Sequence, residues 1–200
     1  MKIRVLVATA LLVLCTSTFA DEPQKKEMSA EEKAAMEAMM KAMTPGDAHK
    51  LLDGMAGTWD AKVTMWMAPG QEPTVSTGTS ENSWVLGNRE MMEKFSGTFM
   101  GMPFSGIGYT GYDNIRQMYV GTWMDSMSTS VMTTSGSAPE GSGKTWSFSG
   151  MMMDPMSSEA VNFDEKITVV DNDHHILEMY GPGPNGATFK MMEITYTRHK

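Results

Sequence analysis

The chain has 200 residues, among them 24 Met, 19 Gly, 9 Pro and a single Cys, and its formal net charge is −8. Nucleic acids and anionic membrane surfaces recruit Lys and Arg, so this acidic balance argues against both as partners. Residues 21–200 contain only 23 Leu, Ile, Val and Phe together, a share that with this charge is typical of disorder. The same segment also holds 23 Met and ten Trp plus Tyr, which is enough apolar material for one core in one domain.

Residues 1–20 have the organisation of a secretory signal peptide. Lys2 and Arg4 provide a positive start, residues 5–14 are apolar, and Thr18-Phe19-Ala20 forms a small-residue cleavage site. The apolar run of about ten residues is too short to cross a bilayer as a helix. We therefore expect secretion across the inner membrane to the periplasm, with no transmembrane segment in the mature form.

Cys15 raises the alternative of a lipoprotein signal, which also ends in Cys. Such signals place a small residue just before that Cys, and here Leu14 occupies the position. Cleavage after Ala20 leaves a mature protein without Cys, which excludes disulfides, thiolate catalysis and Cys-based zinc sites. Loss of Lys2 and Arg4 also moves the formal net charge from −8 to −10.

Residues 21–46 are interpreted as an N-terminal extension with a Met-rich helix. Ser29 and Glu32, three residues apart, form a capping box. Ala-rich sequence follows, and its Met residues recur at the spacing of one face of a short amphipathic helix: Met36, Met39, Met40 and Met43. Thr44-Pro45-Gly46 ends this helix, and Thr44 is expected to cap a second short helix that begins at Pro45.

From Gly57 onward, short runs rich in Thr, Val, Trp, Tyr, Phe and Met are separated every 8–12 residues by Gly, Pro, Asn or Asp. This pattern predicts antiparallel strands. They are expected at residues 58–67, 75–86, 89–99, 104–112, 115–125, 127–135, 144–151, 159–170, 174–181 and 187–198. Ten sequential strands with short hairpins favour an all-β, up-and-down barrel domain over residues 47–200, because closure removes exposed sheet edges. A sandwich is the alternative.

The start of the first expected strand, Gly57-Thr58-Trp59, resembles the Gly-x-Trp opening of lipocalin-type barrels. In those folds the Trp plugs the closed end of the barrel, and an Arg from the final strand packs across it. Arg198, two residues from the C-terminus, matches the position of that partner. The resemblance therefore implies a structural pair of Trp59 and Arg198 at one barrel end.

A longer series of motifs resembles the bacterial domain of unknown function family 1579. The series covers residues 47–198 in this order: Leu51-Leu52, Gly57-Thr58-Trp59, Pro69-Gly70, Leu86-Gly87-Asn88-Arg89, Met102-Pro103-Phe104-Ser105-Gly106, Gly111-Tyr112-Asp113 and Trp123-Met124-Asp125-Ser126. The resemblance implies a calycin-like barrel and no established activity. That family tends to have Gly-Gly before the Arg of its second hairpin, where this chain has Gly87-Asn88, and Asn tolerates the positive φ of such a turn.

A closed barrel of this size either fills its interior with side chains or holds one small ligand. Large aromatic side chains and adaptable Met side chains suit an apolar pocket. The candidates for ligand binding are Trp84, Tyr112, Trp123 and Met124, each of which can equally be a core residue. We predict a secreted protein that binds a small apolar or amphipathic molecule, without catalysis and without a cofactor.

Clustered Met side chains suggest a second function, the binding of Cu(I) or Ag(I), because soft metals select thioether ligands. Met65 with Met67, and Met100 with Met102, are pairs whose spacing places both side chains on one face of a strand. The spread of Met over the whole chain equally fits replacement of Leu by Met in the core. A third alternative, a reversible oxidant sink, requires Met residues on the surface.

The sequence lacks the common catalytic signatures, among them Gly-x-Ser-x-Gly, the P-loop, the dinucleotide fingerprint and His-Glu-x-x-His. Asp113 and Asp125 are expected to flank one end of the barrel, where paired carboxylates can act as acid and base. His174 and His175 follow each other on a strand, so their rings are expected on opposite faces and unable to chelate one metal. These observations favour a protein that is not an enzyme.

Overall fold

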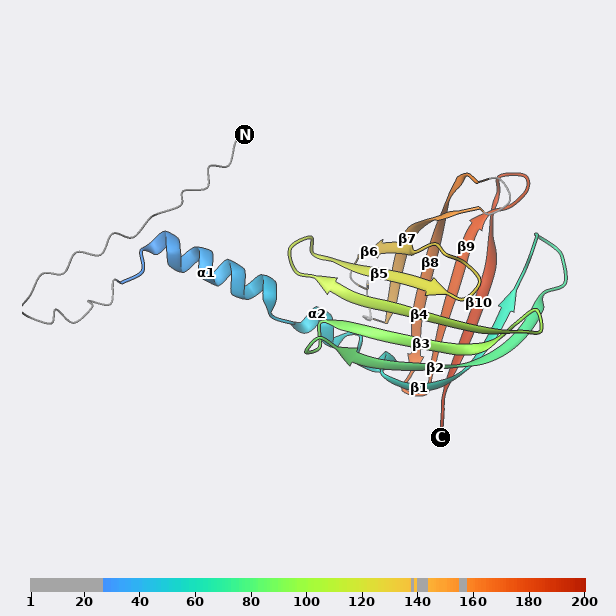
Figure 1. Cartoon of the computed structure of the whole chain (residues 1–200), viewed down its shortest axis with the longest axis horizontal. Helices are drawn as coiled ribbons and strands as arrows, with labels where there is room; N and C mark the ends of the chain where they lie inside the picture. The colour runs from blue at the N-terminus through green and yellow to red at the C-terminus, as the bar shows by residue number, and fades with distance from the viewer. Residues whose placement is uncertain (1–26, 138, 140–143, 155–157) are drawn as a thin grey trace, which may run out of the picture.

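Ten antiparallel strands form one closed barrel in the computed structural model of this chain (Figure 1), which describes residues 27–137, 139, 144–154 and 158–200. The strands are β1 (Gly57–Met65), β2 (Thr74–Val85), β3 (Glu90–Phe99), β4 (Met102–Asp113), β5 (Met118–Asp125), β6 (Met132–Gly136), β7 (Thr145–Met153), β8 (Ala160–Asp171), β9 (His174–Pro182) and β10 (Thr188–Arg198). Each strand pairs with its neighbour in sequence, and β1 pairs with β10 to close the barrel. The predicted up-and-down barrel is thus confirmed, and the sandwich is excluded. The predicted signal peptide lies outside the described residues.

Two strands begin later than the sequence pattern predicted. β5 begins at Met118 because the side chain of Asp113 accepts hydrogen bonds from the backbone N–H groups of Ile115 and Arg116, which forms a turn instead. β6 begins at Met132 because residues 126–131 form a loop, where Asp125 accepts a hydrogen bond from the N–H of Met127.

Three short helical segments precede the barrel: α1 (Ala30–Met43), α2 (Asp47–Lys50) and the 3₁₀ segment η1 (Asp53–Met55). The capping box of Ser29 and Glu32 is present at the start of α1, as predicted. The cap predicted for the second helix is wrong, since α2 follows Gly46. Thr44 instead donates its hydroxyl to the carbonyl of Met40, 2.7 Å away, and so satisfies an acceptor at the end of α1.

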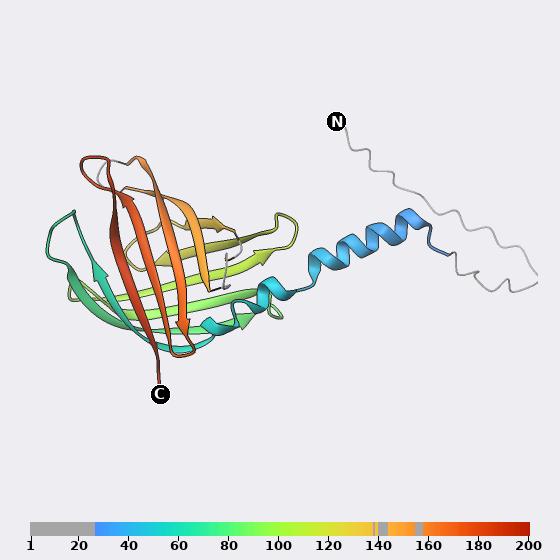
Figure 2. The same cartoon turned by 180° about the vertical axis from the view of Figure 1, so that it is seen from behind.

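Helix α1 projects away from the barrel in both views (Figures 1 and 2), and it has no buried residue. Its four-Met face is therefore exposed. Only the C-terminal end of the helix is attached to the barrel, through the turns that follow β2 and β4. Arg89 donates to the carbonyl of Met43, and Asn114 donates to the carbonyls of Lys41 and Thr44 at 3.0 and 2.8 Å.

One end of the barrel is closed by Trp59, whose side chain is fully buried. Trp59 and Arg198 are direct cross-strand neighbours, and the guanidinium lies over the indole ring at 4.1 Å from its centroid. The indole N–H donates to the carbonyl of Met55 at 2.9 Å. Arg198 also donates to the carbonyls of Ala56 and Asn172 at 3.0 and 2.8 Å. The pair therefore joins the first strand, the last strand and η1.

His175 forms the next layer of this closed end. Its ring stands edge-on to Trp59 at 4.3 Å between centroids and stacks on Tyr196 at 4.2 Å. Burial, and secondarily the charge of Arg198, lowers the pKa of His175 to about 4, so the ring is neutral at pH 7. The neighbouring His174 is exposed and contacts Asp171, so the two rings face opposite ways, as expected.

Aromatic side chains, more than methionines, fill the core. Among the described residues, the core consists of two buried clusters, one around Trp59 and one around Tyr119. Most of their volume comes from Trp59, Phe95, Tyr119, Trp146, Phe148 and Tyr196. In the described part of the chain, Met55, Met91 and Met179 are buried, whereas twelve Met residues are exposed. The expectation that Met replaces Leu in the core thus holds for only a minority of the methionines.

Arg198→Met tests the plug. The variant keeps much of the aliphatic stem but loses the contact with Trp59 and the hydrogen bonds to three backbone carbonyls. We expect the free energy of unfolding, measured by urea denaturation, to fall by about 2–4 kcal/mol. Arg116→Met is the matched control, because Arg116 is exposed and pairs only with Asp113, so its loss should cost less than about 1 kcal/mol. Equal losses in both variants would contradict the structural role of Arg198.

Candidate functional site: a cavity at the open end of the barrel

The two ends of the barrel differ because α2 and η1 cover only one of them. At that end Leu52 and Met55 pack against Tyr119 and Trp146, and the Tyr119 hydroxyl donates to the carbonyl of Ala48 at 2.6 Å. At the opposite end the strands are joined by the loops that follow β1, β3, β5, β7 and β9. No helix in the described chain covers that end. Access to the interior is therefore from the side of these loops.

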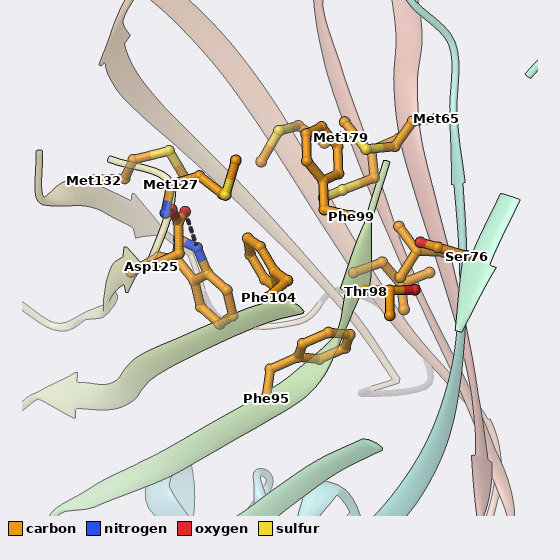
Figure 3. Close-up of a pocket in the computed structure, with 14 residues that line it drawn as sticks. Met65, Ser76, Phe95, Thr98, Phe99, Phe104, Asp125, Met127, Met132 and Met179 are labelled. Carbon is orange, nitrogen blue, oxygen red and sulfur yellow. Dashed lines mark hydrogen bonds between the residues drawn. The ribbon is translucent and has the colours of Figure 1, made fainter. Parts of the chain in front are cut away.

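A cavity of about 270 Å³ occupies this open end (Figure 3). Phe95, Phe99, Phe104 and Trp123 form its aromatic wall. Five methionines line it as well: Met65, Met127, Met132, Met179 and Met192. In Figure 3 Met127 and Met132 lie on the side of Asp125, and Met65 and Met179 lie across the cavity near Phe99. The mouth of the barrel is thus mostly apolar, and the polar residues of its lining are Ser76, Thr98 and Asp125.

Trp123 is held against the wall by its neighbours. Its indole N–H donates to Asp125 at 3.0 Å, and the ring lies over Gly106 and Gly108 of the adjacent strand β4. A Cβ atom at Gly106 would overlap the six-membered ring, so glycine at this position makes room for Trp123. The ring is thereby fixed where it can contact a ligand.

A second volume of about 120 Å³ continues the cavity toward the closed end. The two volumes share part of their walls, including Trp123, Met132 and Met192. The deeper volume is more polar. Its lining includes Glu93, Glu165, Tyr196 and the threonines Thr110, Thr122 and Thr134. A small third volume of about 50 Å³ lies next to the plug and shares Glu93 and Tyr196 with the second.

The two glutamates have unusual surroundings. The accessible surface that each retains belongs to the cavity, while the barrel wall withdraws both carboxylates from bulk solvent. Glu93 accepts hydrogen bonds from Ser80 at 2.7 Å and from Tyr196 at 3.3 Å. Burial, and secondarily the charge of Glu93, raises the pKa of Glu165 to about 7. Burial also raises the pKa of Glu93, against the opposing effect of its two hydrogen bonds.

The structure separates the four residues predicted to bind a ligand. Trp123 lines both parts of the cavity. Trp84 and Tyr112 pack against the core cluster of the closed end, where Trp84 donates to Asp53 at 2.8 Å. Met124 follows Trp123 on β5 and lies on the outer face, 37% exposed. Of the four residues, Trp123 therefore lines the cavity, and strand alternation places its neighbour Met124 on the outer face.

The residues considered for a metal or for acid–base chemistry are also dispersed. Met65 lines the cavity, whereas Met67, Met100 and Met102 are exposed in or beside loops. The expectation that Asp113 and Asp125 flank the same end is wrong. Asp113 ends β4 and Asp125 ends the antiparallel strand β5, so they lie at opposite ends of the barrel. In the part of the chain that the structure describes, no three His, Cys, Asp or Glu residues are grouped as a metal site.

The sequence analysis missed Glu93 and Glu165, although a signal for both is present. In Phe163-x-Glu165-x-Ile167 and in Met91-x-Glu93-x-Phe95, an acidic residue occupies an inward position between two apolar ones. Alternation along a strand places such a residue on the buried face. The two glutamates were not named among the candidate residues, so the polar layer of the cavity was not predicted.

The geometry defines a closed, ten-stranded antiparallel barrel with an internal cavity that is open at one end. The family model described as "Protein of unknown function (DUF1579)" matches residues 44–198, so this chain belongs to that family. The family suggested by the sequence motifs is thereby confirmed. A search of curated proteins finds no match to the chain.

One solved structure supports the same fold. Rv2717c from M. tuberculosis is similar, with a TM-score of 0.57 and 12% identity over 78% of this chain and 100% of that one. A redesigned β-barrel has a TM-score of 0.39 and 15% identity, over 76% of this chain and 96% of that one. A protein of unknown function of the DUF3598 family from Nostoc punctiforme gives 0.24 and 8% identity over 78% and 100%. At such identities the likeness concerns the fold alone.

Among the helices of the described residues, none has the length and apolar character needed to cross a membrane.

Glu165→Gln tests the environment of the buried carboxyl through the pH dependence of stability. The pKa of about 7 in the folded protein exceeds the ordinary value of 4.5, so the folded state holds this proton more tightly. Below pH 4.5 Glu165 is mostly protonated in both the folded and the unfolded state, so its ionisation does not lower the free energy of unfolding. As pH rises to about 7 the unfolded state loses its proton first, and the free energy of unfolding falls by about 3 kcal/mol in total.

The variant lacks this titration. We expect Glu165→Gln to match the wild type in urea denaturation at pH 4.5 and to be more stable than it at pH 8. Comparing the two proteins at each pH cancels groups that do not interact with Glu165, such as His175, whose lowered pKa acts in the opposite direction. Asp164→Asn is the control, because Asp164 is exposed on the other face of β8 and accepts a hydrogen bond from Ser149 that the Asn side-chain oxygen can keep, so this variant should not reproduce the gain at pH 8. A Glu165→Gln profile parallel to that of the wild type would contradict the prediction.

Proposed function

We propose that this protein binds one small apolar or amphipathic molecule inside its barrel, without catalysis. The observation that carries this proposal is the cavity of about 270 Å³ at the open end, whose wall is built from aromatic and Met side chains. Together with the deeper volume of about 120 Å³, it reaches the lower part of the size range typical of small-molecule sites.

The chemistry of the wall supports an apolar ligand body. Burial of apolar ligand surface contributes about 25 cal/mol per Å² removed from water, and Met side chains adapt to the shape of what they contact. Phe95 and Phe104 are fixed edge-to-face at 5.8 Å, so part of the wall is preformed. A preformed wall lowers the ordering cost of binding.

The proposed location is the periplasm. The features that support it are the positive start, apolar run and small-residue cleavage site of residues 1–20. A soluble carrier or sensor of a small amphipathic molecule is consistent with such a compartment, and the mature chain would contain no Cys that oxidation could affect.

Blocking the mouth of the cavity tests the proposal. N-phenyl-1-naphthylamine, a neutral apolar dye that fluoresces in apolar sites, should bind the wild type at one molecule per chain. Ser76→Phe should weaken this binding at least tenfold, because Ser76 lines the cavity and the new ring would occupy it. Thr77→Phe adds the same ring at an exposed position next to it on β2 and should leave binding unchanged. Saturable binding that is equal in all three proteins would place the dye elsewhere and contradict the proposal.

A second candidate, binding of Cu(I) or Ag(I), is favoured by one observation: five thioethers line the cavity. If the cavity holds a soft metal, the variant Met65→Leu/Met132→Leu should lose at least tenfold in anaerobic Cu(I) affinity, measured by competition with a chelator. The control Met151→Leu/Met153→Leu removes two exposed thioethers and should retain the affinity. Unchanged uptake by the cavity variant would exclude this candidate.

A further inference from the structure

The deep part of the cavity contains two carboxylates and no cation to balance them. Glu93 extends from β3 and Glu165 from β8, and both line the same volume of about 120 Å³. Their charges interact, since Glu93 contributes to the raised pKa of Glu165. Among the described residues that line the three parts of the cavity, there is no Lys or Arg.

The other groups that face these carboxylates are neutral at pH 7. From β10, Tyr196 donates its hydroxyl to Glu93, and burial raises the pKa of that phenol further. From β9, His175 stacks behind Tyr196 with a lowered pKa. The polar groups that strands β4, β5 and β6 place around this layer are the threonine hydroxyls and the indole N–H of Trp123, which donates to Asp125. Arg198 lies over Trp59 at the plug, where backbone carbonyls and Asp173 occupy its donors.

Glu165 differs from Glu93 in having no hydrogen-bond donor from the described chain, whereas Glu93 has two. A carboxylate withdrawn from water without a partner is costly, and a positively charged group placed beside it offsets that cost. A cationic group with hydrogen-bond donors is therefore the chemical complement of Glu165. The aromatic wall at the mouth is in turn complementary to an apolar ligand body.

We propose that the cavity selects amphipathic organic cations, with Glu165 as the counter-ion of an ammonium group and Glu93 as a second acceptor. This inference rests on the proposed function and names the class of its ligand. The apolar body of the ligand contacts Phe95, Phe104 and Trp123, and its cationic end reaches the deeper layer. A primary ammonium has three donors, which the two carboxylates and one threonine hydroxyl can accept. Trp123, which lines both volumes, can add a cation–π contact.

Such binding is linked to protonation. A bound ammonium favours the ionised form of Glu165, so binding near pH 7 releases a proton. The affinity for a cation of constant charge should therefore increase between pH 6 and pH 8. A neutral ligand of the same shape should show no such increase.

Three probes with the same eight-carbon chain test the inference: octylammonium, 1-octanol and octanoate. Each is used to displace N-phenyl-1-naphthylamine from the full mature protein at pH 8. We expect octylammonium to bind at least tenfold more tightly than 1-octanol, and octanoate to bind most weakly. In Glu165→Gln the preference for the ammonium over the alcohol should fall at least fivefold, while the affinity for 1-octanol is retained. Asp164→Asn removes one exposed negative charge and should keep the full preference.

The outcomes separate this inference from the function on which it rests. If 1-octanol displaces the dye and octylammonium is no better, the cavity binds apolar molecules but the inference is wrong. If the dye itself does not bind, the proposed function fails and the inference with it. A preference that survives in both Glu165→Gln and Glu93→Gln would assign it to other acidic groups, either Asp125 at the mouth or the acidic surface, and overturn the inference. Should one variant fail to fold, the other variant and the rise in wild-type octylammonium affinity from pH 6 to 8 decide the question.

Discussion

The structure depends on the contact between Trp59 at the start of the first strand and Arg198 at the end of the last. These residues pair directly across β1 and β10, the two strands whose pairing closes the sheet. Arg198 also binds the carbonyls of Ala56 and Asn172, so one side chain connects η1, β1 and the turn before β9. Closure satisfies the backbone groups that an open sheet would leave exposed at its two edges. The cavity inside the barrel therefore depends on this closure of the sheet.

A plug at one end has a consequence at the other. The aromatic clusters around Trp59 and Tyr119 concentrate buried surface in the closed half and the wall, which leaves the open half free to keep a cavity. A stable closed half also allows the barrel to retain Glu93 and Glu165, which are costly groups in its interior. Proteins tolerate such destabilising groups at binding and catalytic sites, where the groups interact with a ligand or substrate. From the open end to the closed end, the interior thus changes from a mostly apolar mouth to a layer with two carboxyl groups and then to a neutral aromatic floor.

The methionines divide by location into groups with different environments. Those on α1 are exposed and lie on a helix attached to the barrel only at its C-terminal end. Those at the mouth line the cavity, and in the described part of the chain three are buried, of which Met179 also lines the cavity. Composition cannot distinguish these environments, because a thioether at helical or strand spacing has the same pattern whichever face meets the protein.

The order of hydrophobic runs and turn residues was enough to predict ten antiparallel strands, because strand period and turn chemistry are local properties. The family and the contact of Trp59 with Arg198 were predicted from the resemblance of sequence motifs to known families. The placement of Trp123 inside and Met124 outside, and of Asp113 and Asp125 at opposite ends, required the register and direction of the strands in the closed sheet. The pairing of Glu93 with Glu165 is more remote still, since it joins β3 and β8 across the barrel. Alternation along a strand identifies an acidic residue that faces inward. Which residues lie opposite it is determined only when the sheet closes into a barrel.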